Sequence, residues 1–244
     1  MMRATVAAAC VLLMVGSAMG DVISQSDSVS FSSDLEADKT ITLDSFDTTA
    51  DYGLPLGQWA DLILVTVTVT HEGSATMGAD NDDPFNTTNV NARVVRTWAL
   101  TGPGVTSSAS KTVQSQPVFL DVDDTDGGDP DLFDPTPDDG HDFGALGYPS
   151  EAAAVLPNGT PAPALYETVG PGTVDFIVDV VAMVNDLQFD VAPDAWQMEV
   201  ENPILTVTVD LDYEWIAVPE PATASLIAVV GAAVLLRRRR RRIR

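Results

Sequence analysis

The sequence predicts a single all-β domain, an antiparallel β-sandwich of about eight strands, between an N-terminal signal helix and a short hydrophobic C-terminal helix. Three observations predict this fold. Several segments alternate apolar and polar residues with the period of two that half-buried strands have. Gly, Pro, Asn and Asp cluster between those segments, as turns require. Between the termini no segment has the 3.6-residue periodicity of an amphipathic helix. Both jelly-roll and immunoglobulin-like topologies fit this pattern.

The N-terminus, residues 1–20, has the features of a secretory signal peptide. Arg3 supplies a short positive region and residues 6–15 form an apolar run. Small residues follow, which predicts that signal peptidase cleaves between Gly20 and Asp21. The alternative is an uncleaved anchor helix. Cleavage would remove Cys10, the one cysteine, and leave the mature chain without a disulfide or a reactive thiol.

The sandwich is expected over residues 21–217, and its clearest strand is 204–215. There Val, Leu, Tyr and Trp alternate with Thr, Asp and Glu, which indicates one buried face and one acidic, hydrated face. Residues 62–71 and 173–184 repeat the pattern. Weaker strand candidates are 22–31, 39–46, 90–100, 111–122 and 187–191. Residues 151–156 can form one helical turn at most, because prolines bound them.

The charge of the chain is distributed unevenly. The whole sequence has a net charge of −24, but residues 21–218 contain 35 acids and four basic residues, a net charge of −31. Those four are Lys39, Arg93, Arg96 and Lys111. A surface of this kind repels nucleic acid and anionic lipid, which excludes both as partners. It favours cations.

One segment, residues 121–142, has ten aspartates among 22 residues, and its prolines exclude a helix. Calcium prefers six to eight oxygen ligands, which flexible aspartate-rich loops supply. The calcium ligands we predict in this acidic loop are Asp121, Asp123, Asp124, Asp126, Asp129 and Asp131. The EF-hand pattern does not fit, because Val122 and Phe133 occupy ligand positions. The alternative is a solvated acidic loop, and a second calcium candidate is Asp80, Asn81, Asp82 and Asp83.

No catalytic motif is present in the sequence, and we predict no catalytic residues. His71 ends a predicted strand and is expected at the surface. His141, with Asp139 and Asp142, is either solvated or a zinc ligand. Two other functions stay open. A carbohydrate-binding module would present a row of exposed rings from Trp59, Trp98, Trp196 and Trp215. A secreted glycan hydrolase would have a cleft with two facing carboxylates, one with a raised pKa.

The C-terminus, residues 218–244, has three parts in a fixed order. Val218-Pro219-Glu220-Pro221 precedes an uncharged segment, residues 222–236, and then six consecutive arginines. Fifteen helical residues span about 22 Å, less than the roughly 30 Å of a bilayer core. This arrangement closely resembles the PEP-CTERM protein-sorting signal. The resemblance implies recognition of Pro219, Glu220 and Pro221 by a membrane-embedded exosortase and transient membrane insertion through residues 222–236. The alternative is a tail anchor that is never cut.

A weaker resemblance covers about residues 25–217. Asp44-Ser45-Phe46-Asp47-Thr48-Thr49, a Thr/Val-alternating strand and late Val-rich strands resemble the extracellular choice-of-anchor domains, of the E type, that precede such tails. Together the two resemblances imply a protein exported to the cell surface or extracellular matrix. We therefore expect a non-enzymatic, acidic protein with an adhesive or structural role, assisted by calcium. Its expected partners are anionic exopolysaccharide or cell-surface glycans.

Overall fold

The computed structural model describes residues 21–54, 58–123, 133, 138–153 and 161–219 of the chain. Eight long strands form the body: β1 (Asp21–Phe31), β2 (Lys39–Asp44), β4 (Gln58–Asp80), β5 (Thr88–Gly102), β6 (Val105–Gln114), β8 (Gly140–Ala152), β10 (Thr173–Phe189) and β11 (Gln197–Pro219). The shorter elements are β3 (Phe46–Asp47), β7 (Val118–Leu120), β9 (Glu167–Thr168) and the 3₁₀ turn η2 (Pro163–Leu165).

The two helices predicted for residues 1–20 and 222–236 lie outside the described residues, as do the sorting residues Glu220 and Pro221. Among the residues that the structure describes, no helix is long and apolar enough to cross a membrane.

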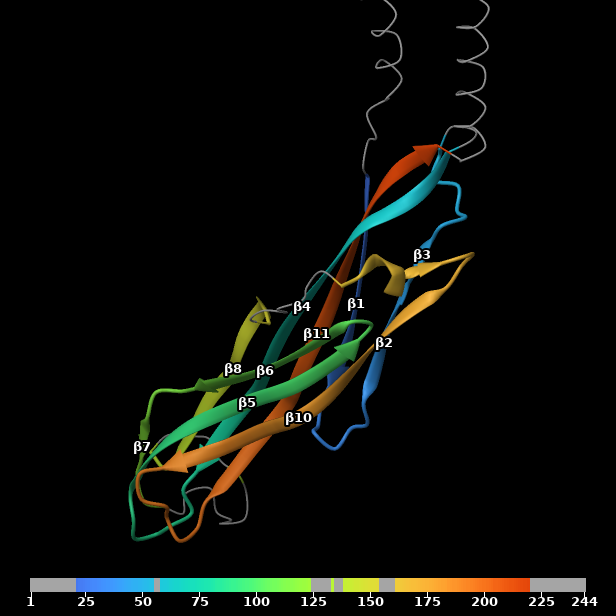
Figure 1. Ribbon diagram of the computed structural model, residues 1–244. Helices are drawn as coiled ribbons and strands as arrows, with labels where there is room; N and C mark the ends of the chain where they lie inside the picture. The colour runs from blue at the N-terminus through green and yellow to red at the C-terminus, as the bar shows by residue number, and fades with distance from the viewer. Residues whose placement is uncertain (1–20, 55–57, 124–132, 134–137, 154–160, 220–244) are drawn as a thin grey trace, which may run out of the picture.

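The strands form two facing antiparallel sheets, with the orders β1-β11-β4-β8 and β2-β10-β5-β6, and β7 also pairs with β5 (Figure 1). Counted along the chain, the first long strand pairs with the eighth, the second with the seventh, the third with the sixth and the fourth with the fifth. This order is that of a long hairpin rolled into two layers, the jelly roll. The prediction of a single antiparallel β-sandwich is confirmed, and the pairing selects the jelly roll over the immunoglobulin-like order.

The core comes from alternate residues of strands in both sheets. Val65, Val67 and Val69 of β4 and Leu211 and Tyr213 of β11 all point inward and are at most 2% exposed. The intervening Thr, Asp and Glu residues point to solvent, as the period-two pattern predicts. The three clearest predicted strands, 204–215, 62–71 and 173–184, lie within β11, β4 and β10.

Three predictions about strands are wrong in detail. Residues 187–191 do not form a separate strand, because β10 continues to Phe189. Residues 111–122 divide into β6 and β7. The acidic loop, predicted to extend to residue 142, ends at Gly140, where β8 begins. β8 itself was not predicted, because its glycines and proline mask any alternation of apolar and polar residues.

A layer of buried polar side chains crosses the sandwich about two thirds of the way along β4. Arg96 of β5 is fully buried. Its guanidinium donates hydrogen bonds to carbonyl oxygens of Ser74 (2.8 Å), Ile204 (3.0 Å) and Val184 (3.2 Å). It also donates to Val95 O and to Asn185 Oδ1. These acceptors lie on strands of both sheets, so one side chain ties the two sheets together. Gly73 makes room for it, because a Cβ there would lie 2.7 Å from Arg96 Cγ.

His71 of β4 belongs to the same layer, which corrects the prediction that it is a surface residue at a strand end. β4 extends nine residues beyond it, and the ring is 3% exposed. Nδ1 of His71 lies 3.0 Å from the hydroxyl of Tyr148, and Nε2 lies 3.7 Å from Glu151. Burial lowers the pKa of His71, with Glu151 acting in the opposite direction.

Candidate functional site: the acidic tip

One group of loops between the strands lies at the end of the molecule far from Asp21 and Pro219 (Figure 1). The register shows this directly, because Asp80 at the end of β4 pairs with Gln197 at the start of β11 and with Gly140 at the start of β8. We call the described residues of these connections, 81–87, 121–123, 138–140 and 190–196, the acidic tip.

The carboxylate of Asp83 organises the acidic tip. It is 1% exposed, and it accepts hydrogen bonds from the backbone N–H of Phe85 (2.8 Å) and from that of Asp194 (2.8 Å) in a different connection. It also accepts bonds from the side chain and backbone of Asn86. The hydrogen bond from the Asn86 side chain contributes most to lowering the pKa of Asp83 to about 2. Asp83 therefore joins two connections as a carboxylate whose charge is compensated by N–H donors.

The two calcium candidates from the sequence lie against each other at the acidic tip. The side-chain amide of Asn81 donates to the carbonyl oxygen of Asp121 (2.5 Å), and the N–H of Asp123 donates to that of Asp83 (3.0 Å). The N–H of Asn81 also donates to Asp139 O (3.0 Å). Residues 80–83 and the two ends of the acidic loop are thus one structural unit, although the sequence analysis treated them as separate candidates.

Asp190 has a similar structural role in the third connection. It accepts hydrogen bonds from the backbone (2.9 Å) and the side chain (2.7 Å) of Asn89, and one from Thr88. The Asn89 side chain is the main cause that lowers the pKa of Asp190 to about 2. The organising roles of Asp83 and Asp190 were not predicted from the sequence. The signal that could have found them is an aspartate close to Asn and Thr at the end of a strand, which favours side-chain bonding to backbone N–H groups.

Phe133, inside the acidic loop, packs on the sheet. A Cβ placed on Gly78 of β4 would lie 2.5 Å from the Phe133 ring. The ring therefore occupies the space that the missing side chain of Gly78 leaves open. This contact places the Phe133 ring against β4.

The acidic tip is strongly negative. Ten aspartates lie in it or directly beside it: Asp80, Asp82, Asp83, Asp121, Asp123, Asp138, Asp139, Asp142, Asp190 and Asp194. No lysine or arginine lies among the residues 80–87, 121–123, 138–142 and 190–196. Such a surface attracts cations from solution.

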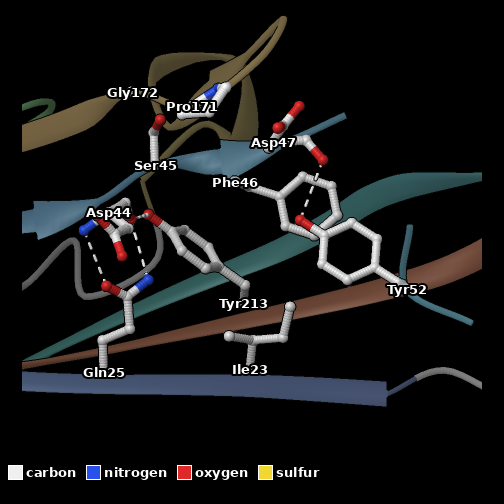
Figure 2. A pocket seen from close by; sticks show the side chains of 10 residues that line it. All are labelled: Ile23, Gln25, Asp44, Ser45, Phe46, Asp47, Tyr52, Pro171, Gly172 and Tyr213. Atoms are coloured by element: carbon white, nitrogen blue, oxygen red, sulfur yellow. Dashed lines mark hydrogen bonds between the residues drawn. The ribbon is translucent and has the colours of Figure 1, made fainter. Parts of the chain in front are cut away.

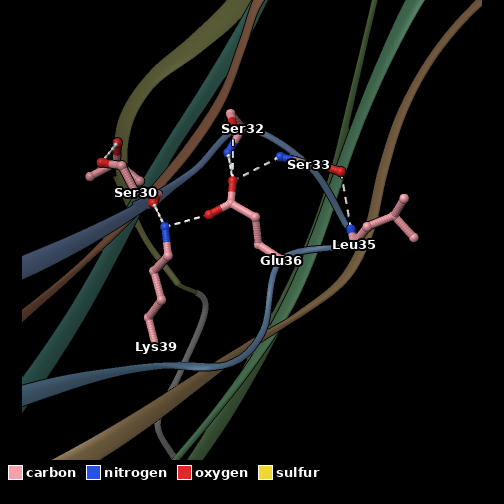
Figure 3. Close-up of polar contacts among 7 residues, drawn as sticks. Ser30, Ser32, Ser33, Leu35, Glu36 and Lys39 are labelled. Carbon is pink, nitrogen blue, oxygen red and sulfur yellow. Dashed lines mark hydrogen bonds and ion pairs between the residues drawn. The ribbon is translucent and has the colours of Figure 1, made fainter.

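The four basic residues of the body are engaged elsewhere. Lys39 pairs with Glu36 (2.5 Å), whose carboxylate also accepts hydrogen bonds from Ser32 and Ser33 (Figure 3). Lys111 pairs with Glu151 (2.8 Å), Arg93 pairs with Asp186, and Arg96 binds carbonyl groups in the polar layer. None of these four contacts neutralises an aspartate of the acidic tip.

The predicted calcium ligands are only in part described. Asp121 and Asp123 lie at the acidic tip, whereas Asp124, Asp126, Asp129 and Asp131 lie outside the described residues. Within the described part of the chain, no three His, Asp or Glu side chains come together closely enough to hold a metal ion. A calcium site that included Asp121 or Asp123 would therefore need oxygen ligands besides the Asp and Glu side chains of the described residues.

Of the residues that predicted a zinc site, His141 lines a small cleft at the acidic tip, whereas Asp139 and Asp142 are not among the residues that line it. The cleft has a volume of about 260 Å³ and is lined by Asp121, Asp138, His141, Phe119 and neighbouring residues. The His141 ring packs edge-on against Phe143, 4.8 Å between ring centres. Carboxylate oxygens and an imidazole at one cleft can contact a cation or hydroxyl groups of a ligand.

A second cleft, of about 360 Å³, lies on the flank where β1 faces β2 and β3 (Figure 2). Its polar groups mostly bind one another. The side chain of Gln25 donates to Asp44 O (3.0 Å) and accepts from Asp44 N (2.8 Å). The Tyr213 hydroxyl donates to the same Asp44 oxygen, and that of Tyr52 donates to Asp47 O. These hydrogen bonds join the edges of the two sheets, so the polar groups of the cleft stabilise the fold.

The sequence also left open a secreted glycan hydrolase and a carbohydrate-binding module. This cleft does not support the first, and the tryptophans do not support the second. Asp47 lines the cleft, but its pKa is lowered, chiefly by a hydrogen bond from Thr49, whereas a glycan hydrolase needs a raised one. Trp98 and Trp215 are buried in the core. Trp59 and Trp196 are partly exposed, but they lie near opposite ends of β11 and form no row.

The chain matches none of the family models, curated proteins or solved structures with which it was compared.

Proposed function

We propose that this protein is an exported acidic protein of the cell surface or extracellular matrix, sorted by an exosortase, with an adhesive or structural role. The acidic tip is its contact surface. There, bound calcium bridges its carboxylates to anionic exopolysaccharide or cell-surface glycans. The observation that carries the proposal is that the acidic tip lies at the end of the sandwich opposite Asp21 and Pro219.

The sandwich separates its acidic tip from its attachment end. Asp21 and Pro219 lie at one end of the paired strands β1, β4 and β11, and the residues before and after them carry the predicted signals. β4 and β11 each have 23 residues. At about 3.3 Å per residue they span about 75 Å. A protein held at a membrane through its C-terminal segment would present the acidic tip far from the lipid, where extracellular polymers are within reach.

The chemistry of the acidic tip favours a cation-bridged partner. Its carboxylates repel an anionic polymer directly. Calcium, a hard cation that takes six to eight oxygens, can bind carboxylates of the protein and of a uronic-acid polymer at the same time. Asp121 and Asp138, both exposed beside the tip cleft, are the described carboxylates best placed to share such an ion.

Binding of the full chain to immobilised alginate, a polyuronate, tests the proposal. We expect binding with millimolar calcium and loss of binding with chelator. The double variant Asp121→Asn/Asp138→Asn should lose at least tenfold in affinity. The matched control is Asp210→Asn/Asp212→Asn, which removes two carboxylates from the solvent face of β11, away from the acidic tip.

Calcium-independent binding, or an equal loss of affinity in both double variants, would refute a specific cation bridge at the acidic tip. Equal losses would mean that the total charge of the protein, not the tip, decides the interaction.

A further inference from the structure

The apolar core of the sandwich is not continuous. One cluster holds 25 buried apolar residues of the described chain, including Val67, Trp98 and Leu211. Towards the acidic tip two small clusters hold seven: Ala75, Met77, Ala79, Val90, Ala92, Val94 and Leu120. Three of those seven are alanines, which bury little apolar surface. Partly buried apolar residues also pack against the small clusters: Phe143, Leu146, Leu187, Val200, Val118 and Phe189. Burial therefore stabilises this part too, but by less than it stabilises the rest of the sandwich.

The polar layer lies between the large and the small clusters. On β4, Val69 belongs to the large cluster and Ala75 to a small one, with His71 and Gly73 between them. On β5, Trp98 and Val94 lie on the two sides of Arg96. Hydrogen bonds, in place of apolar contacts, thus connect the two parts of the interior at this level.

The strand ladders are irregular at the same level. The pairing of β11 with β4 shifts between Glu201 and Ile204, and Ile204 O accepts a hydrogen bond from Arg96. The pairing of β4 with β8 shifts between His71 and Gly73. In the other sheet, the pairing of β10 with β5 shifts between Val180 and Ala182, close to where Met183 pairs with Arg96. Irregular pairing weakens the coupling of successive residue pairs along a ladder.

Electrostatic repulsion is concentrated at the acidic tip. The ten aspartates of the acidic tip lie beyond the small clusters. The ion pair of Arg93 with Asp186 lies on the same side of the polar layer. The acidic tip therefore bears like-charge repulsion with no lysine or arginine among its residues, in addition to the repulsion among carboxylates elsewhere in the sandwich, such as Asp210 and Asp212.

We propose that the sandwich consists of two cooperative units that meet at the polar layer, and that the unit bearing the acidic tip opens locally while the other stays folded. The proximal unit, which is the part nearer Asp21 and Pro219, contains the 25-residue cluster. The distal unit contains the small clusters and the acidic tip. Units with few buried apolar contacts open at a lower free energy than the whole protein does. The division depends on cores and ladders alone, so it stands whether or not the acidic tip binds calcium.

Hydrogen exchange of the full chain across a series of urea concentrations tests the division. Urea is suitable because it is uncharged and does not screen the aspartates. We expect the amides of Met77, Ala79 and Val94 to share one free energy of opening. They should exchange at least tenfold faster than the amides of Val67 and Leu211. Their exchange should also depend less on urea, because a local opening exposes less surface than global unfolding.

The variant Val67→Ala makes the test sharper. Val67 is 2% exposed in the large cluster, so its truncation destabilises the proximal unit. The state with only the distal unit open contains the same folded proximal unit as the native state. Both states lose equal stability, and the exchange of distal amides should not change. Proximal amides should exchange about tenfold faster, since they need global unfolding.

Val67→Ala could prevent folding, and the urea dependence of the unmodified chain then decides alone. Distal and proximal amides that converge on one rate with one urea dependence would overturn the division, as would equal acceleration of both groups by Val67→Ala. Added calcium separates this inference from the proposed function. Two units with exchange unaffected by calcium would keep the inference and count against the calcium bridge. A single unit stabilised by calcium would do the reverse.

Discussion

Replacing Arg96 by methionine tests the physical account of the polar layer. The guanidinium donates five hydrogen bonds, and four of its acceptors belong to other strands: Ser74 O, Val184 O, Asn185 Oδ1 and Ile204 O. Methionine keeps much of the side-chain volume and removes the donors and the charge.

Two effects of opposite sign determine how far Arg96→Met changes the free energy of unfolding. A buried acceptor without its donor costs about 1 kcal/mol at the least, so four acceptors cost about 4 kcal/mol. Removing the buried charge also removes its desolvation penalty, which stabilises the folded state. For this reason, apolar replacement of buried charges is sometimes stabilising. Here the acceptors stay buried after the replacement, since their strands are held by the ladders on either side. We therefore expect a net loss of about 3 kcal/mol.

Urea unfolding of the full chain at pH 7, followed by tryptophan fluorescence, measures this change. For a domain of this size, about 3 kcal/mol corresponds to a melting temperature lower by about 6 to 12 °C. The control is Arg93→Met, three residues away on the same strand. Arg93 binds a single carboxylate, Asp186, and both side chains are about one third exposed, so its midpoint should stay close to that of the unmodified chain.

An Arg96→Met midpoint equal to or above that of the unmodified chain would show that the carbonyl groups of the polar layer do not need the guanidinium. The interpretation of Arg96 as the tie between the two sheets would then be wrong.

Three further predictions address the buried histidine, the acidic loop and the sorting signal. Burial lowers the pKa of His71 below its ordinary 6.5, so the unfolded chain takes up a proton there before the folded chain does. Stability should fall as the pH drops from 7 towards 5, and His71→Gln should flatten this part of the urea-midpoint profile; an unchanged slope would assign the effect to another group. Gly78→Ala should displace Phe133, because the new Cβ would lie 2.5 Å from its ring, and should make the acidic loop more sensitive to limited proteolysis than in the unmodified chain. Glu220→Gln should leave export across the inner membrane intact but block processing of the tail, while Glu214→Gln in β11 should be processed normally; normal processing of both would contradict the sorting hypothesis.

The strands that alternate most regularly were predictable. β11, β4 and β10 contain the three clearest predicted segments, because a strand with one face on a core requires apolar residues at every second position. β8 was missed, since Gly144, Gly147 and Pro149 interrupt its pattern. Gly147 is there for a tertiary reason: a Cβ at this position would lie 2.6 Å from Gly73 O on the neighbouring strand. A residue chosen for a close approach between strands gives no periodic signal.

The position of His71 could not be predicted for a related reason. Its strand was expected to end there, because the predicted alternation of residues 62–71 ends at His71. In the fold, Gly73 and Ser74 continue β4. Gly73 leaves space for Arg96 of the opposite sheet, and the carbonyl oxygen of Ser74 accepts a hydrogen bond from it. Whether a polar residue is exposed or belongs to a buried network depends on the facing strand, which is distant in sequence.

By itself, the sequence determined the local properties: the all-β class, the position of most strands, the acidity of residues 80–83 and of the acidic loop, and the placing of every basic residue of the body outside those segments. Only the tertiary structure decided which strands pair, and hence that Asn81 bonds to Asp121, forty residues away. It also decided that Arg96 and His71 are buried and that the acidic tip lies opposite Asp21 and Pro219. The physical reason is that periodicity reports the environment of a residue relative to its own strand. The order in which strands of similar pattern pair depends on packing between residues far apart in the chain.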